Sequence, residues 1–176
     1  MMSMCKTLAA TILAGTMLFA GSAAAADKAP SGTASSKDGK AMELVQEWDK
    51  VFPRSDKVEH RKVTFRTRYG TVLAGDLYVP RDAKGKLAAL AVSGPFGAVK
   101  EQAAGLYAQT MAERGFLTIA FDPSFTGESG GQPRYMASPD INTEDFQAAV
   151  DHLCMREDVN PEKIGIIGIC GWGGMA

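Results

Sequence analysis

The chain has 176 residues, of which 45% are hydrophobic, and its 19 basic and 20 acidic residues give a net charge of -1. This composition is ordinary for one globular domain, and it lacks the excess of positive charge that typifies nucleic-acid binding proteins. We therefore expect no nucleic-acid partner.

The first 26 residues have the pattern of a signal peptide. Lys6 supplies a positive charge, residues 7–20 are apolar but too short to span a bilayer as an ordinary helix, and residues 24–26 are alanines suited to cleavage. We expect export to the periplasm or medium, with cleavage near Ala26 and no stable membrane anchor afterwards. An uncleaved N-terminal anchor is the alternative. Residues 27–40 have the composition of a flexible linker, and residues 41–176 form the folded part.

Two antiparallel strands are predicted near the start of the folded part. A short helix is expected over residues 42–52, ended by a proline. Residues 58–66 then alternate apolar and polar side chains, Tyr69 and Gly70 indicate a turn, and residues 72–79 read as a second strand. The pattern predicts a β-hairpin.

Buried strands and helices alternate in the rest of the chain. Continuous apolar runs predict strands that are covered on both faces of a parallel sheet, at residues 87–92, 116–121 and 164–169. Helical periodicity predicts helices from about residue 100 to 114, and from Asn142 or Thr143 to before residue 160. With right-handed crossovers, these elements form an α/β sheet whose first strands are antiparallel.

The last predicted strand delivers one cysteine, Cys170, into a cluster of glycines. A buried strand that ends in a sharp turn is one way in which a protein exposes a nucleophile. Backbone N–H groups and the start of a following helix favour the thiolate, which is the reactive form. Cys170 is therefore a candidate nucleophile. It could instead be a small apolar residue that fills a tight turn, or form a disulfide with Cys154 after export.

Several segments resemble the α/β-hydrolase superfamily. Gly168-Ile169-Cys170-Gly171 after a buried strand looks like its nucleophile elbow, in the cysteine form known from dienelactone hydrolase. Residues 93–97 occupy the place of the oxyanion loop, and residues 122–130 (DPSFTGESG) resemble the loop after the fourth strand. The resemblance covers residues 58–176. It implies the N-terminal half of an α/β-hydrolase domain: a mostly parallel sheet with an antiparallel N-terminal hairpin, truncated after the elbow strand.

The resemblance also implies an activity and site residues. The family function would be hydrolysis of an ester, lactone or related acyl bond in a small-molecule substrate, with attack by Cys170. The Gly171 N–H and one N–H of residues 93–97 would hold the oxyanion. Pro95 cannot donate, which leaves Phe96 or Gly97, and we take Phe96 as the candidate. No cofactor and no metal ion are implied.

One residue departs from the family pattern. The superfamily usually has a small residue two places after the nucleophile, where this chain has Trp172. We expect Gly173 and Gly174 to relax the turn and admit the indole.

Other catalytic parts are not found in the sequence. The superfamily takes its acid and its histidine from later loops, and His60 and His152 are predicted to be structural. Residues 100–102 are predicted to form a solvated first helical turn, and Asp122 to bind local backbone N–H groups. Without a base, we expect this chain to be inactive as written.

Two alternatives belong to other classes. The chain could be a non-catalytic truncated product, with its last strand as an exposed edge. Residues 171–176 also match the G-x-G-x-x-A fingerprint of dinucleotide-binding modules, although that fingerprint usually opens a domain.

Overall fold

The computed structural model describes residues 42–176, so the predicted signal peptide and linker lie outside the described residues. The expected helix over residues 42–52 is wrong, because this segment has no regular secondary structure. Side-chain contacts hold it instead: Trp48 Nε1 donates to the Phe52 carbonyl over 2.9 Å, and the Phe52 side chain is buried. An isolated helix this short has little stability of its own, so tertiary contacts decide the conformation of the segment.

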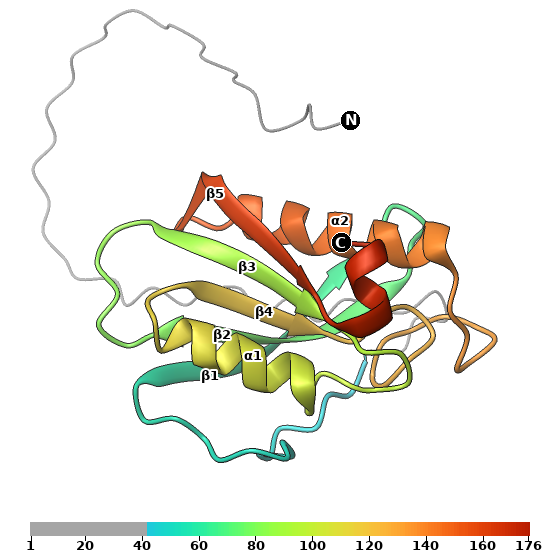
Figure 1. Ribbon diagram of the computed structural model, residues 1–176, viewed down its shortest axis with the longest axis horizontal. Coiled ribbons are helices and arrows are strands. Elements are labelled where there is room, and N and C mark those ends of the chain that lie inside the picture. Colours follow the sequence, from blue (N-terminus) through green and yellow to red (C-terminus); the bar gives the residue numbers. More distant parts are fainter. Residues whose placement is uncertain (1–41) are drawn as a thin grey trace, which may run out of the picture. The chain divides into compact units, whose positions relative to one another are not determined.

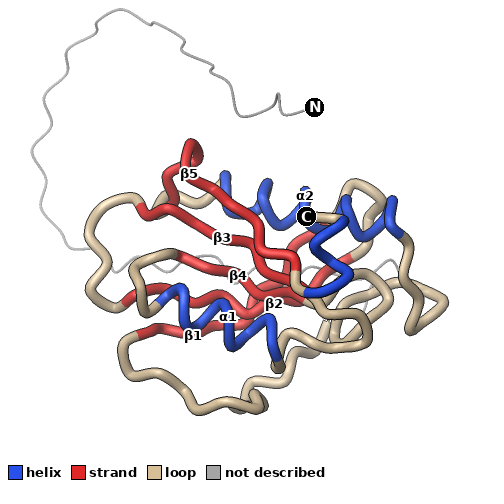
Figure 2. The backbone as a smooth tube through the Cα atoms, in the orientation of Figure 1, coloured by secondary structure: helices blue, strands red, loops and turns tan. Residues whose placement is uncertain are grey.

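Five strands form one mixed sheet (Figure 1; Figure 2). Their spatial order is β1-β2-β4-β3-β5. β1 and β2 form the predicted antiparallel hairpin, β2 pairs antiparallel with β4, and β3 pairs in parallel with both β4 and β5. The fold class expected from the sequence is confirmed. The strand bounds are β1 Val58–Arg66, β2 Val72–Pro80, β3 Leu87–Ser93, β4 Leu117–Phe121 and β5 Val159–Gly168.

Two α-helices make the crossovers between the parallel strands. Helix α1, Ala103–Ala112, joins β3 to β4, and helix α2, Pro139–Cys154, joins β4 to β5. Helix α2 begins earlier than predicted because Pro139 takes the first helical turn, where its missing N–H costs nothing. The Asn142 side chain accepts the Ser138 N–H over 2.8 Å from inside the helix.

The helices cover opposite faces of the sheet. Neighbouring residues of β3 point to different sides, so Ala91 packs in the core beneath α2 while Val92 packs beneath α1. This double cover explains the uninterrupted apolar runs of β3 and β4. β5 lies at the edge of the described sheet and is only partly buried, with Ile166 40% exposed, so the expectation that this strand is covered on both faces was wrong. Within residues 42–176, neither helix has the length and apolar character needed to cross a membrane.

Candidate active site

Cys170 lies at a sharp corner directly after β5. It opens the 3-10 helix η1, Cys170–Gly174, with a backbone φ of +60°, and it is exposed. The preceding Ile169 N–H donates to the Ser93 carbonyl over 3.0 Å, which holds the ends of β5 and β3 together. Positive φ is uncommon for a residue other than glycine and is found at strained functional turns. The expected sharp turn is present, and the nucleophilic role of Cys170 stays a prediction.

Trp172 fits into this turn because other residues leave room for it. Its side chain is 2% exposed. A Cβ atom on Gly94 would lie 2.7 Å from Trp172 Cδ1, and one on Gly168 would collide with the Trp172 carbonyl. Gly173 and Gly174, by contrast, have no tight contacts at their Cβ positions. The space therefore comes from Gly94 and Gly168, and the expectation that the two later glycines provide it was wrong.

Phe96 and Gly171 lie against each other. The Phe96 ring is half exposed, and it covers Gly171 so closely that a Cβ there would collide with it. The ring centroid is 5.6 Å from that of Trp172. Within residues 42–176, neither the Phe96 N–H nor the Gly171 N–H donates a hydrogen bond. Both N–H groups can therefore donate to a substrate oxygen, although their role as oxyanion donors stays a prediction.

The two histidines are engaged away from Cys170. His60 Nε2 lies 2.8 Å from Asp76 Oδ1 on the β1-β2 hairpin, at the opposite side of the sheet from β5. The His152 ring stacks on Phe65 with centroids 5.3 Å apart, and burial lowers its pKa from 6.5 to about 4, with nearby arginines adding to the effect. Both positions fit the structural roles predicted for them. Within the described residues, no disulfide joins Cys154 to Cys170.

Lys100 is the residue that sequence reasoning placed wrongly. It is only 1% exposed, whereas a solvated helical turn was expected. Its Nζ donates to Asp122 Oδ2 over 2.8 Å, to Glu128 Oε2 over 2.6 Å and to Glu101 Oε1 over 2.5 Å. The partners come from the loop after β4 and from the turn before α1, so no local periodicity could indicate this cluster. The prediction that Asp122 binds backbone N–H groups is confirmed, since it accepts those of Lys100 and Glu128.

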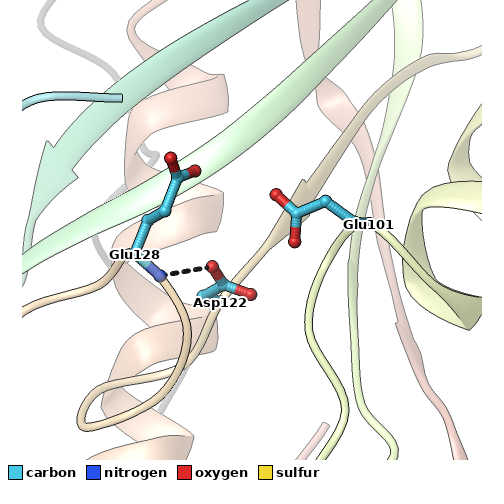
Figure 3. A group of neighbouring side chains, drawn as sticks. All are labelled: Glu101, Asp122 and Glu128. Carbon is cyan, nitrogen blue, oxygen red and sulfur yellow. Dashed lines mark hydrogen bonds between the residues drawn. The ribbon is translucent and has the colours of Figure 1, made fainter. Parts of the chain in front are cut away.

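The three acidic partners of Lys100 have the composition of a metal site. Oxygen atoms of Glu101, Asp122 and Glu128 lie within 4.8 Å of one another (Figure 3). The Lys100 ammonium group, however, contacts one oxygen of each carboxylate. A metal ion would have to displace this buried cation. The ammonium group therefore occupies the place that a metal ion would take and offsets part of the negative charge, with Lys62 Nζ also pairing with Glu101 and Glu128.

Two hollows among residues 42–176 lie away from Cys170. Each has a volume of about 220 Å³; Trp48 and His60 border one, and Pro80 and Glu113 border the other. Neither is lined by Cys170, Phe96 or Gly171.

Comparison with a bacterial protein links this chain to a known structure. The chain is 66% identical over 151 residues to the uncharacterized protein PA2218 of Pseudomonas aeruginosa, which covers 84% of this chain and 41% of that protein. The crystal structure of PA2218 matches with a TM-score of 0.76 and 69% identity, over 78% of this chain and 43% of that chain.

Two fungal proteins extend the comparison. The thiohydrolase aneE of Aspergillus aculeatus is 34% identical over 122 residues, covering 69% of this chain and 37% of that protein. The crystal structure of the α/β hydrolase GrgF from Penicillium sp. sh18 matches with a TM-score of 0.60 and 27% identity, over 66% of this chain and 39% of that chain. The chain spans less than half the length of each of these relatives.

A family assignment follows from the sequence and the fold together. Residues 69–176, more than half of the chain, match the sequence profile described as X-Pro dipeptidyl-peptidase (S15 family). The strand order and the corner after β5 agree with the α/β-hydrolase resemblance found in the sequence. The chain therefore belongs to the X-Pro dipeptidyl-peptidase (S15) family and has an α/β-hydrolase fold.

Proposed function

We propose that Cys170 is the nucleophile of an acyl-transfer site that acts on an ester, lactone or related acyl bond. The observation that supports this most is the exposed cysteine at a positive-φ turn, followed by the Gly171 N–H, which has no acceptor within residues 42–176. A relative named a thiohydrolase also suits a reaction at an acyl carbon. The substrate is expected to be a small molecule, with no nucleic-acid partner.

The reaction would begin with attack by the Cys170 thiolate on the carbonyl carbon. As the carbon–sulfur bond forms, the carbonyl π electrons move to oxygen, and the Gly171 and Phe96 N–H groups stabilise the resulting oxyanion. Collapse of this intermediate expels the leaving group and leaves an acyl thioester on Cys170. The alcohol product and the thioester account for all atoms of the substrate and the thiol.

Release of the acyl group requires a base that activates water. His60 and His152 are held elsewhere in the described structure, and such proton transfer contributes about 10² to 10⁴ in rate. We therefore expect the 176-residue chain to accept one acyl group and to turn over very slowly. p-Nitrophenolate is a stable leaving anion, so an activated ester still allows the first step.

The test is acetylation of the purified chain by p-nitrophenyl acetate. We expect a burst of about one p-nitrophenolate per chain, with the acetyl group on the Cys170 peptide by mass spectrometry. Acetylation should be faster than that of glutathione at the same pH, should persist in Cys154→Ser and should disappear in Cys170→Ala. Acetylation no faster than glutathione would remove the proposal, and sustained turnover that depends on Cys170 would disprove the expected inactivity.

We also propose that the protein is exported. The sequence of residues 1–26 supports this proposal. Expression of the full chain followed by cell fractionation should place it in the periplasm or medium, with Asp27 as the first residue by N-terminal sequencing. Recovery of the uncleaved chain from the cytosol, or from the membrane, would contradict it.

A further inference from the structure

The loop that carries Phe96 is held at its far end by one buried residue. Lys100 lies four positions after Phe96, and its backbone N–H donates to Asp122 Oδ1 over 2.8 Å. Its side-chain Nζ donates to Asp122 Oδ2 over 2.8 Å. Both side chains of this ion pair are 0% exposed. One carboxylate thus binds the main chain and the side chain of the same residue, which fixes where the loop after β3 ends.

Asp122 is in turn fixed to the sheet. It directly follows β4, and its own N–H donates to the Ala74 carbonyl of β2 over 3.0 Å. Its Oδ2 accepts the Glu128 N–H over 2.9 Å. Gly127 packs so closely on the carboxylate that a Cβ there would collide with it. The Asp122 side chain therefore has a single position, set by the sheet and by the loop after β4.

The carboxylates around Lys100 keep its amine charged. Burial alone would lower the pKa of Lys100, but the Asp122 and Glu101 carboxylates outweigh burial and raise it, so the amine stays protonated. A buried ammonium group with several carboxylate partners is sensitive to loss of any one of them, because the remaining charges are left without compensation. The loop end therefore has one favoured arrangement.

We propose that Lys100 is a positioning residue of the acyl-transfer site, whose bonds to Asp122 place the loop after β3 and thereby the Phe96 N–H that receives the oxyanion. This inference rests on the proposed function of Cys170. Lys100 touches no reacting atom in this account. It acts only through the backbone that joins it to Phe96.

Two reagents for the same thiol separate this role from a general structural one. Acetylation by p-nitrophenyl acetate charges a carbonyl oxygen and needs the oxyanion donors. Alkylation by iodoacetamide forms a carbon–sulfur bond and expels iodide, so it needs the thiolate but no oxyanion donor. The ratio of the two rates at Cys170 therefore reports the donors, whereas thiol exposure and ionisation affect both rates.

The main variant is Lys100→Met, with Lys62→Met as the matched control. Lys62 is also buried in this cluster and lies 2.7 Å from Glu128, but among the described residues it makes no bond to Asp122. We expect Lys100→Met to lower the acetylation-to-alkylation ratio about ten- to hundred-fold, since a misplaced donor loses much of its effect. The alkylation rate and its pH profile should stay as in the parent chain, and Lys62→Met should keep the parent ratio.

A milder variant keeps the proposal testable if Lys100→Met does not fold by circular dichroism. Asp122→Asn retains an acceptor for the Lys100 backbone N–H and removes the ion pair, so its ratio should also fall. An unchanged ratio in a folded variant, or an equal fall in Lys62→Met, would overturn the inference. Parent-chain acetylation no faster than glutathione would instead remove the proposed function, so the two failures are distinguishable.

Discussion

Replacing Gly94 with alanine tests the packing that admits a tryptophan two places after the candidate nucleophile. Gly94 has a φ of +95°, and a Cβ there would lie 2.6 Å from the Ile169 carbonyl oxygen and 2.7 Å from Trp172 Cδ1. Relaxed contacts between such atoms are about 3.5–4.0 Å. The left-handed conformation costs about 1–2 kcal/mol and the overlap about 1–3 kcal/mol more. We therefore expect Gly94→Ala to lower the free energy of unfolding by about 2–5 kcal/mol.

Urea unfolding followed by far-UV circular dichroism measures this loss, and Gly97→Ala is the matched control. Gly97 lies in the same loop with a φ of +73°, but its Cβ position has nothing within 4 Å, so alanine there carries only the conformational cost. The difference between the two variants isolates the contact with Trp172 and Ile169. Adding Trp172→Leu to Gly94→Ala should recover part of the overlap cost. Equal losses in Gly94→Ala and Gly97→Ala would refute this account of how Trp172 packs.

Variants at three further positions test buried polar groups. Since burial lowers the pKa of His152 from 6.5 to about 4, the unfolded chain binds the proton first as pH falls. The free energy of unfolding of the parent should therefore fall by about 2 kcal/mol between about pH 7.5 and pH 5, whereas His152→Phe should not show this fall. The same pH dependence in both chains would contradict this prediction. Asp145 accepts hydrogen bonds from the Ser124 N–H over 2.8 Å and from the Ser124 hydroxyl over 2.6 Å. Asp145→Ala should therefore lower the free energy of urea unfolding by about 3–5 kcal/mol, and Asp145→Asn by clearly less. Equal losses in the two variants would show that the charge of Asp145 matters and its hydrogen bonds do not. Thr118→Val removes a buried bond of 2.9 Å to the Ala108 carbonyl and should cost about 1 kcal/mol, with a loss above about 3 kcal/mol indicating a wider disturbance.

The strands were the most predictable part of the fold. Alternation gave the β1-β2 hairpin, and continuous apolar runs gave β3 and β4 to within one residue at each end, whereas β5 begins at Val159, five residues before the predicted start. A strand buried on one face alternates apolar and polar residues, and a strand buried on both faces is apolar throughout, so the residues of each segment indicate its burial. The corner after β5 was also predictable, because an apolar strand that ends in Gly-x-Cys-Gly has a restricted set of continuations.

Two local expectations failed for the same reason. The helix over residues 42–52 was inferred from one apolar face, yet Trp48 of that face contacts the hairpin instead, with its ring centroid 5.2 Å from that of His60 on β1. The polar turn before α1 was expected to be solvated, yet Lys100 is buried beside Asp122. In both cases a partner distant in the chain decided what a segment's own pattern could not.

The sequence by itself determined the order and type of the main elements, the family, and Cys170 as the candidate nucleophile. These features depend on the apolar pattern and the glycines of each segment, which can be read without knowing its partners. Only the tertiary structure decided how Trp172 is accommodated by Gly94, and that Lys100 and Asp122 join the loops after β3 and β4. The bonds in this cluster link residues up to 66 positions apart, as for Lys62 and Glu128. Such pairs form only when the sheet brings its strand ends together, because the sequence around a charged side chain does not indicate which distant residue will bind it.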